Sequence, residues 1–479
     1  MTNTTAADDG LLTGRIARFI LETDARTLPA EVLQAARNAL LDTVGVGLIG
    51  SREPVSTIAQ QLVTEIGAKP RATLWGTPLR SSPFEAASAN GICAHALDFD
   101  DSHPSVRGHA SAPTVATALA VGEATGAPGA AVLSAYAIGL EIAGKLGRAM
   151  GPGHYMRGWH ATSTISTFSA AAAAGRLWHL DVPQMRTALS IAASQLSGLV
   201  RNFGTMTKPF HAGRAARAGM LAAWLAKNGH TADEAIFDGR NDVLATYGSG
   251  DGEALADVVA ALGAPWEVVN PGNWVKRWPC CYAGHRAIGG MFKLVEQHAI
   301  RAAEIQSVAV GFMRGSETAL ISTNPQTGLE GKFSVEYMIA AAVLDGRLVL
   351  DTFTDRMVQR PEARALMAKV RRYIVDDGKI YGLDATNDVE VETARGRFKV
   401  HVEHTPGSLD WPMTDADRRD KFNGCAEPVL GKAGAAKLLD LIMHCAALPD
   451  VGELLRATVP VAEQAAVVLH DPAPASEGG

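Results

Sequence analysis

Over roughly its first 272 residues, the chain has the hydrophobic spacing of successive helices. Apolar residues recur at intervals of three and four over 32–44, which places them on one helix face. The segment SPFE at 82–85 has the sequence of a capping box with proline at the first helical position, and it predicts a helix from Pro83 that carries His95 and Asp98. Similar patterns predict helices over 112–126, 129–149, 161–178, 184–199 and 213–228. Many of these segments are rich in alanine and glycine, so we expect a tight, mostly buried bundle.

The pattern changes after residue 272. Residues 305–312 alternate partly, as in a strand, and 389–402 predict a β-hairpin because polar and apolar residues alternate on both arms. Helical patterns lie between and after these strands, over 285–298, 334–344, 361–373 and 431–446. We therefore expect a mostly α fold: a large all-helical domain formed by residues 1–272 and 413–479, in which the C-terminal helix packs back on the first part, and a smaller α+β domain formed by residues 273–412.

Composition narrows the class of protein. Hydrophobic residues are 47% of the 479 residues and charged residues 20%, which is typical of a globular protein. Lys+Arg 44 against Asp+Glu 50 gives a net charge of −6, so we expect no face for nucleic acid or an anionic membrane. The five cysteines form no CxxC, which argues against a zinc ribbon, an iron–sulfur cluster or a disulfide framework. Charges interrupt the apolar stretches and the N-terminus lacks a signal-peptide pattern, so we expect a cytoplasmic protein without a membrane span.

The segment HALDFDDSHPSVRGH at 95–109 combines three histidines and three aspartates with a single arginine. If the helix predicted from residue 83 persists, His95, Asp98 and Ser102 share one of its faces. Pro104 ends any such helix, which places the carboxylates at the end of the helix dipole that disfavours them. Carboxylates in such a position indicate a function, and a solvated acidic turn is the alternative.

Two further segments place cationic or imidazole groups at helix starts. GWHATST at 158–164 places His160 at the start of an alanine-rich helix, where backbone N–H groups favour a carboxylate. The alternative is an N-capping segment with an incidental histidine. RNFGTMTKPFHAGR at 201–214 gathers Lys208 and several arginines just before a helix predicted to begin at Pro209 or shortly after, which has the form of an anion receptor. The alternative is a solvated basic loop.

A fourth segment, KRWPCCYAGHR at 276–286, lies at the predicted domain junction, where ligand sites often form. Together the four segments supply imidazoles, a lysine with arginine neighbours, and carboxylates. The chain has no GxSxG, no P-loop, no GxGxxG after a strand and no dedicated set of metal ligands. This inventory suits proton abstraction beside a carboxylate: a histidine removes an acidic C–H proton, while lysine and arginine hold the carboxylates of a small polycarboxylate substrate.

In this order and spacing, the segments resemble the MmgE/PrpD family. The shared motifs are HALDFDDSH, GHASAP, GWHATST, TKPFHAGRAA and WPCCYAGH, and the similarity extends over roughly residues 12–460. Members of the family include 2-methylcitrate dehydratases, cis-aconitate decarboxylases and iminodisuccinate epimerases. The resemblance implies a large all-helical domain, a smaller α+β lid domain, a site between the two, a homodimer, and neither a metal nor another cofactor.

The resemblance also implies roles for residues that match the family motifs. Its central polar residues are Asp98, His109, His160 and Lys208. His109 or His160 would provide the acid/base pair, Lys208 would bind a carboxylate, and Asp98 would hold a neighbouring histidine or lysine in its working state. The implied substrate-binding residues are Ser102, His103, His285 and Tyr337.

One difference bears on the reaction. In the decarboxylase branch of the family the acidic turn resembles DFDDTWHP, whereas here Ser102 replaces the threonine, the tryptophan is missing, and the spacing to His109 is one residue longer. The difference favours a hydro-lyase similar to 2-methylcitrate dehydratase over a cis-aconitate decarboxylase or an iminodisuccinate epimerase.

Three alternatives belong to other classes. DFDD at 98–101 fits the DxDD motif of one class of terpene cyclases, but those enzymes need an aromatic-lined cavity and only 6% of this chain is aromatic. A metal hydrolase would use His95, Asp98, Asp101, His103 and His109. A non-catalytic polycarboxylate-binding protein would bind its ligands without exchanging their α-hydrogens with solvent.

Overall fold

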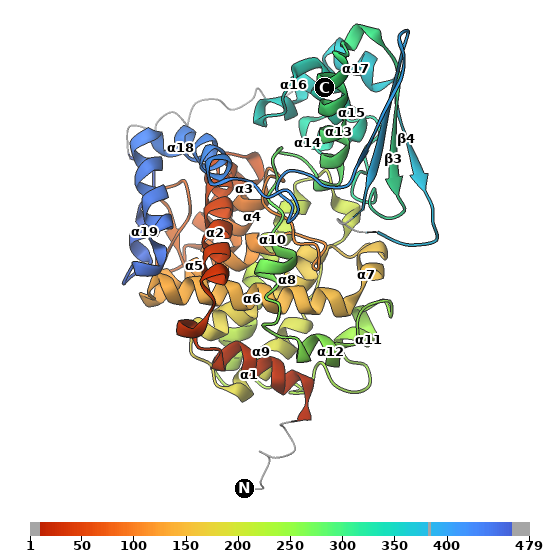
Figure 1. The fold of residues 1–479 in the computed structure, drawn as a ribbon. Coiled ribbons are helices and arrows are strands. Elements are labelled where there is room, and N and C mark those ends of the chain that lie inside the picture. Colours follow the sequence, from red (N-terminus) through yellow and green to blue (C-terminus); the bar gives the residue numbers. More distant parts are fainter. Residues whose placement is uncertain (1–9, 382–384, 462–479) are drawn as a thin grey trace, which may run out of the picture.

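The computed structural model describes residues 10–381 and 385–461 and has two parts, a large helical body and a smaller part built on a mixed sheet (Figure 1). The predicted mostly α fold with a small α+β part is confirmed. The boundaries expected for the two domains stay a prediction, and their outer segments, 1–9 and 462–479, lie outside the described residues.

The helical body contains most of the predicted helices. They are α1 (Leu12–Glu22), α2 (Ala30–Gly50), α3 (Pro54–Ile66), α4 (Pro83–His95), α5 (Ser111–Thr125), α6 (Gly129–Met150), α7 (Pro152–Met156), α8 (Ala161–Leu177), α9 (Val182–Ala193), α10 (Thr207–Lys227), α11 (Val243–Tyr247) and α12 (Leu255–Ala260), with α18 (Asp415–Met443) and α19 (Gly452–Arg456) from the C-terminal part. A two-stranded ribbon of β1 (Ala72–Thr73) and β2 (Arg80–Ser81) lies beside them.

Small residues set the distances between the central helices. A Cβ on Gly219 of α10 would lie 2.3 Å from the carbonyl oxygen of Thr167 in α8, and one on Gly213 would lie 2.3 Å from the carbonyl oxygen of Ser88 in α4. Any side chain at these two glycines would push the backbones apart. The tight, buried bundle expected from the alanine and glycine content is therefore confirmed, and α10 lies in close contact with both α4 and α8.

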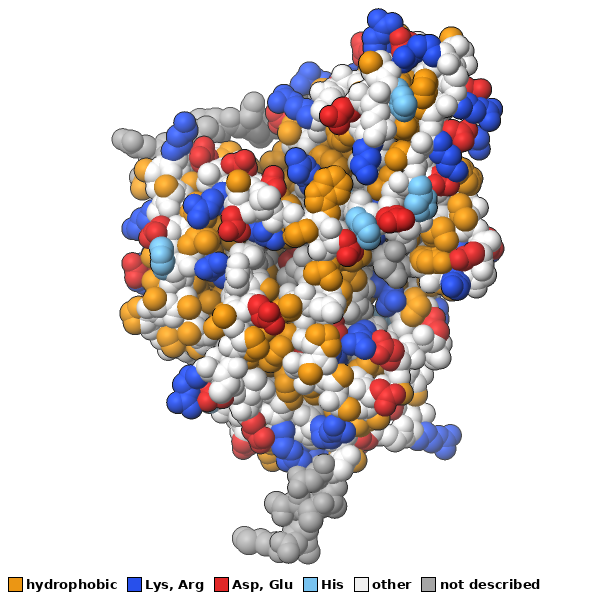
Figure 2. Space-filling view, viewed as in Figure 1, with side chains coloured by type: hydrophobic (Ala, Val, Ile, Leu, Met, Phe, Trp, Pro, Cys, Tyr) orange, Lys and Arg blue, Asp and Glu red, His pale blue; other side chains and the backbone are white. Residues whose placement is uncertain are grey.

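Helix α6 is long and apolar enough to span a membrane, but 89% of its apolar window is buried inside the protein. It runs across the helical body in Figure 1. On the face shown in Figure 2, Lys and Arg side chains are interspersed with Asp and Glu.

The C-terminal helix returns to the first part of the chain, as expected. The ring of Phe422 in α18 packs on Gly45 of α2, where a Cβ would come within 2.9 Å of the ring, and the ammonium of Lys421 lies 2.6 Å from a carboxylate oxygen of Asp42. The predicted helix over 431–446 is only the second half of α18, which begins at Asp415 and has a break in its helical geometry at Gly431.

The smaller part contains a four-stranded sheet in the order β4-β3-β5-β6. Its strands are β3 (Ile305–Met313), β4 (Val370–Val375), β5 (Asn387–Thr393) and β6 (Gly396–Val402), and its helices are α13 (His285–His298), α14 (Gly328–Gly331), α15 (Val335–Asp345), α16 (Asp355–Gln359) and α17 (Pro361–Met367). The predicted hairpin is β5–β6, paired antiparallel with Val389 opposite Val400. Val389 and Val391 are buried, and Val389 packs against Gly290 of α13.

The prediction of one helix over 361–373 is wrong. Helix α17 ends at Met367, and residues 370–375 form β4, which pairs in parallel with β3. The intervening helices α14 to α17 supply the long crossover that a parallel pair needs. The segment VRRYIV has β-branched and aromatic residues, but its helix-like spacing continued that of α17 and concealed the boundary.

Three other helix boundaries differ from the prediction, and the first two matter for the site. Helix α4 ends at His95, so Asp98 and Ser102 do not share its face. Helix α10 begins at Thr207 rather than after Pro209, which places Lys208 in its first turn. Helix α9 ends at Ala193, earlier than the predicted 199.

Candidate active site

The acidic segment is folded into the protein interior, so the alternative of a solvated turn is wrong. Asp100, Asp101 and His103 are fully buried, and Asp98 is 2% exposed. The segment is fixed to the chain that enters the smaller part, because Ser102 and Trp274 exchange backbone hydrogen bonds of 2.9 and 2.8 Å. Asp98 has a φ of +52°, which is uncommon for a residue other than glycine and aims its side chain away from the path of α4.

Two lysines converge on one oxygen of Asp98. The ammonium of Lys208 donates to Oδ1 at 2.6 Å, and that of Lys276 donates to Oδ1 and to the backbone carbonyl of Asp98, both at 2.7 Å. Burial opposes ionisation of Asp98, but Lys208 and Lys276 outweigh it and hold the pKa of Asp98 well below its ordinary value. Burial likewise lowers the pKa of Lys276, but the charge of Asp98 outweighs it and raises that pKa.

His109 has a fixed tautomer. Its Nδ1–H donates to the backbone carbonyl of Asp101 at 2.7 Å, and since a carbonyl only accepts, the proton of the neutral ring is on Nδ1. Nε2 therefore keeps its lone pair and lies 3.6 Å from Oδ1 of Asp98. Burial, with the charge of Lys276, lowers the pKa of His109 well below its ordinary value. A neutral imidazole with an available Nε2 is a competent general base.

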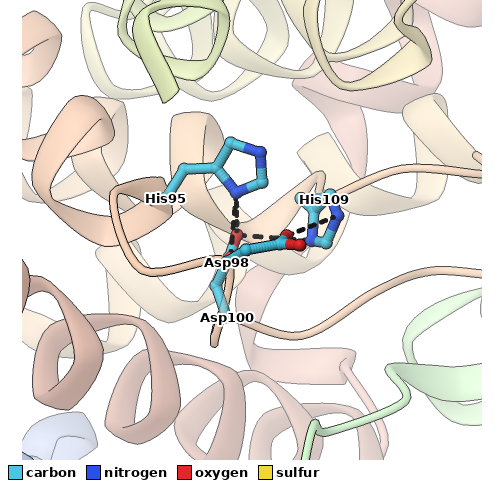
Figure 3. Close-up of side chains that lie close together, drawn as sticks. All are labelled: His95, Asp98, Asp100 and His109. Atoms are coloured by element: carbon cyan, nitrogen blue, oxygen red, sulfur yellow. Dashed lines mark hydrogen bonds and ion pairs between the residues drawn. The ribbon is translucent and has the colours of Figure 1, made fainter. Parts of the chain in front are cut away.

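Figure 3 shows His95, Asp98, Asp100 and His109 side by side. Nδ1–H of His95 donates to the carboxylate of Asp100 at 2.9 and 3.0 Å, and the ring centroids of His95 and His109 are 4.4 Å apart. One possible ligand atom from each of these four residues lies within 4.8 Å of all the others.

This cluster does not suit a metal ion. Lys208 and Lys276 already donate to the oxygen that Asp98 would offer, and two ammonium groups would repel a divalent cation at that distance. The five ligands of the metal-hydrolase alternative are not gathered either. His103 Nε2–H donates to the carbonyl of Glu267 at 3.0 Å, and the Asp101 carboxylate accepts from the Ser111 hydroxyl at 2.7 Å.

His160 occupies the N-cap of α8, as expected, so the positive end of that helix adjoins it. Its Nδ1 lies 2.9 Å from Nδ1 of His211, its ring meets Phe203 edge-on at 4.7 Å, and its centroid is 5.9 Å from that of His95. Burial, with the charge of Lys208, lowers the pKa of His160 well below its ordinary value.

Lys208 extends from the first turn of α10 between two aromatic rings. Its ammonium lies 4.9 Å from the centroid of Phe203 and 4.7 Å from that of Phe333, so both rings stabilise the charge. An ammonium has three N–H donors, and the contact with Asp98 uses one. The remaining donors are available to the carboxylate of a ligand. The alternative of a solvated basic loop is wrong for Lys208, which is 3% exposed.

Lys208, His109 and His160 line one cavity between the helical body and the smaller part. The cavity offers about 70 Å³ to the centres of water molecules, which is room for roughly five waters and suits a small organic acid. The residues lining it are Ser102, Arg107, Gly108, His109, Pro152, Tyr155, Met156, His160, Phe203, Lys208, Cys281, Tyr282, Ala283, Gly315, Ser316, Ala319 and Tyr381. Its wall thus combines cationic and imidazole groups with a largely apolar remainder.

Three predicted substrate-binding residues lie elsewhere. His103 faces Glu267, as described above. His285 directs Nε2 at the carbonyl of Cys280 at 3.3 Å and stacks on Tyr282, and it is not part of the cavity wall. Tyr337 is buried in the smaller part, where its hydroxyl donates to the carbonyl of Thr352. The prediction that these three residues contact the substrate is therefore not supported by their positions, whereas Ser102 does line the cavity.

Several residues of the site were not predicted. Lys276 and Cys281 belong to a segment that the sequence singled out, but only His285 was chosen from it. Cys281 lines the cavity, and burial raises the pKa of its thiol to about 11. In the sequence, the position of Lys276 and the two adjacent cysteines at the predicted domain junction was the signal that could have identified Lys276 and Cys281 as site residues. Arg217, which follows the basic segment at 201–214, pairs with Glu85 at 2.8 Å.

Burial shifts the pKa values of many imidazoles and carboxyls in the protein interior. Among the described residues, seven imidazoles have pKa values below their ordinary value, with burial as the largest cause: His95, His103, His109, His154, His160, His211 and His285. Four carboxyls have pKa values raised by burial: Asp42, Glu53, Asp101 and Glu141.

Comparisons of the sequence with known proteins identify a family and several relatives. Residues 14–255 match the sequence model of the MmgE/PrpD N-terminal domain, and residues 278–445 match that of the C-terminal domain. The chain is 26% identical over 477 residues to a cis-aconitate decarboxylase-like protein of Aspergillus oryzae, covering 95% of this chain and 98% of that protein. It is 26% identical over 440 residues to cis-aconitate decarboxylase of Homo sapiens, covering 89% and 90%, and 24% identical over 470 residues to cis-aconitate decarboxylase of Aspergillus terreus, covering 93% and 95%.

Proposed function

Since the chain belongs to the MmgE/PrpD family of lyase-type enzymes that act on small carboxylic acids, we propose that it transfers a proton at the carbon beside a carboxylate of a di- or tricarboxylic acid, without a metal or another cofactor. One observation carries this proposal: His109, His160 and Lys208 come from three distant segments and line the same small cavity. The residues combine two neutral imidazoles with one ammonium group, which are the groups that such a reaction needs.

Each of the three groups has a distinct role in the proposal. Lys208 binds a substrate carboxylate with the N–H donors that Asp98 does not use. His109 accepts or returns a proton through Nε2, since its Nδ1–H is held by the carbonyl of Asp101. His160 is the second acid/base group, and bound carboxylates favour its protonated form because their negative charge offsets the desolvation that lowers its pKa.

Decarboxylation of an acid of the cis-aconitate type is the first reaction to test, because the relatives reported above carry that activity in their names. In this reaction the C–C bond to one carboxylate breaks and releases CO₂. Its electron pair enters the conjugated system of the remaining unsaturated acid, and an imidazolium delivers one proton to carbon. The apolar residues of the cavity wall favour the loss of a carboxylate that they desolvate.

Dehydration of an acid of the 2-methylcitrate type is the second candidate, because the acidic turn departs from the decarboxylase pattern at Ser102 and in its spacing to His109. Here a neutral imidazole removes the proton beside a carboxylate, the C–O bond breaks, and the second ring, present as an imidazolium, protonates the departing hydroxide so that water leaves. Ser102 and His109 both line the cavity.

The test is to incubate the purified protein with cis-aconitate, 2-methylcitrate and iminodisuccinate in D₂O and to follow each by NMR. We expect turnover of one of them, with solvent deuterium at the carbon beside a carboxylate, and loss of both signals in His160→Gln. Binding of these acids without turnover or exchange would instead identify a polycarboxylate-binding protein and refute the proposal.

The expected homodimer and cytoplasmic location are also proposals. Light scattering of the purified chain tests the first, and fractionation of the producing cell tests the second. A monomer at the working concentration would refute the dimer.

A further inference from the structure

His160 and His211 form a pair that no sequence motif assigned a task. Their Nδ1 atoms are 2.9 Å apart, which is a hydrogen-bond distance, so one proton lies between the two atoms and one ring donates to the other. Two lone pairs or two N–H groups facing each other at this distance would repel. Both rings are buried, His160 at 1% and His211 at 5% exposure.

The backbone around the pair leaves little freedom for either ring. His160 donates its backbone N–H to the carbonyl of Gly198 at 3.0 Å. Gly198 has a φ of +108°, and a Cβ there would lie 3.3 Å from Cγ of His211 and 2.9 Å from Cβ of Ser163. Because Gly198 has no side chain, the His211 ring can lie beside His160. The fold of the backbone therefore holds the two rings together.

The direction of the hydrogen bond follows from the chemistry of His160. Its Nδ1 is occupied by His211, so the nitrogen left for a substrate is Nε2. When Nε2 is a base, the proton of the neutral ring is on Nδ1, and when Nε2 has accepted a proton, the imidazolium has protons on both nitrogens. Nδ1 of His160 therefore carries a proton in both states, and its partner must offer a lone pair.

We propose that His211 is a positioning residue whose Nδ1 accepts the Nδ1–H of His160, so that His160 can take a proton from substrate carbon and return it at Nε2. The inference rests on the proposed function. When the reaction begins with proton abstraction, as in dehydration, the C–H bond breaks, an Nε2–H bond forms, and the electron pair of the C–H bond moves into the adjacent carboxylate as an enolate; in decarboxylation the Nε2–H bond of the imidazolium breaks instead, as its proton is delivered to carbon. The Nδ1–H bond stays intact, and His211 stabilises the charged ring without exchanging a proton.

The surroundings keep His211 itself neutral. Burial, with the charges of His95 and Lys208, lowers the pKa of His211 to about 4. Besides burial, the charge of Lys208 and any charge on His211 or His95 disfavour the protonated form of His160, and Asp98 favours it. A neutral His211 adds no such repulsion. A neutral His211 in the Nε2–H tautomer is an acceptor at Nδ1 in every state of the cycle, as a carboxylate is for the histidine of a serine protease triad.

The first test uses the full-length protein without substrate. Nitrogen NMR of ¹⁵N-histidine-labelled protein, assigned with His160→Gln and His211→Phe, reports which ring nitrogen carries the proton. We expect Nδ1–H on His160 and Nε2–H on His211. Finding Nδ1–H on His211 would overturn the inference whatever the substrate is, so this result is separate from a failure of the proposed function.

The second test uses the substrate that the NMR assay identifies. His211→Phe keeps a ring of similar size but accepts no hydrogen bond, and we expect kcat to fall roughly 10²- to 10⁴-fold with KM nearly unchanged. His211→Asn places an amide oxygen near the position of Nδ1, and we expect it to restore kcat to within about tenfold of the wild type.

His154→Phe is the matched control. It removes a buried imidazole that bonds the carbonyl of Tyr247 and the hydroxyl of Thr164 outside the cavity wall, so it lowers stability without a selective loss of kcat. Equal losses of kcat in His211→Phe and His211→Asn would show a purely structural role. A folded His211→Phe with the wild-type kcat would also refute the inference.

Discussion

Replacing Lys208 and Lys276 separately by methionine tests how the site binds an acid. Both ammonium groups donate to Oδ1 of Asp98, at 2.6 and 2.7 Å, and both side chains are buried. Only Lys208 lines the cavity. The two variants therefore remove the same charge from the same carboxylate, and they differ in whether the lost ammonium can reach a substrate.

The expected loss of affinity belongs to Lys208→Met alone. A hydrogen bond to a charged group contributes about 1.5–3 kcal/mol, which corresponds to a roughly 10- to 150-fold higher Kd or KM for the acid. Isothermal titration with the substrate or a non-reacting analogue measures the Kd, and steady-state kinetics measure KM and kcat. We expect Lys276→Met to change Kd by less than about threefold.

Both variants should lose stability to a similar extent. Removing one partner of a buried ion pair costs about 3–5 kcal/mol, and we expect the lower end because the other lysine stays on Asp98. An unfolding entropy of about 2.1 cal/mol/K per residue gives roughly 1 kcal/mol/K for this chain, so Tm falls by about 3 °C in either variant. An unchanged Kd in Lys208→Met, or an equal rise of Kd in Lys276→Met, would refute the assignment of Lys208 as the carboxylate-binding group.

Three further predictions follow from the burial and contacts of the site. The free energy of unfolding should fall as the pH is lowered from about 7 to 5, because seven imidazoles of the described residues have pKa values in the folded chain below the ordinary value near 6.5, so the unfolded chain binds more protons in this range. The four carboxyls with raised pKa values oppose this trend but are fewer, so a Tm that stays flat or rises towards pH 5 would contradict it. Dialysis against EDTA should leave activity unchanged, because two ammonium groups already bind the Asp98 carboxylate. Loss of a stoichiometric metal together with loss of activity would contradict this prediction. Tyr337→Phe should retain kcat/KM while losing about 1 kcal/mol of stability, because its hydroxyl bonds the carbonyl of Thr352; a large rise in KM would restore it as a substrate contact.

Much of the fold could be predicted from local pattern. The helices begun by SPFE at 82–85 and by GWHATST at 158–164 start where their capping sequences placed them, and the β5–β6 hairpin lies where the alternation indicated. The second strand of the parallel pair was missed, because residues 370–375 gain their strand character from pairing with β3. Pairing between distant segments leaves no local period in the sequence.

The predicted centre of the site, Asp98, His109, His160 and Lys208, is brought together, while His103, His285 and Tyr337 are directed elsewhere. Residue type and spacing suffice to identify groups that bear chemistry. Residue type and spacing do not fix the direction of a side chain that lies beyond the end of a helix. Because α4 ends at His95, the later residues of the acidic segment do not follow its helical faces.

By itself, the sequence determined the helical class, the small α+β part, the family, and the segments that carry imidazole, carboxylate and ammonium groups, because periodicity, capping and motif order are local properties of the chain. The tertiary structure decided that Lys276 joins Lys208 on Asp98, that the carbonyl of Asp101 sets the tautomer of His109, and that His211 lies beside His160. These relations depend on burial and on contacts across up to 178 positions, where a desolvated charge or lone pair must find its partner in space.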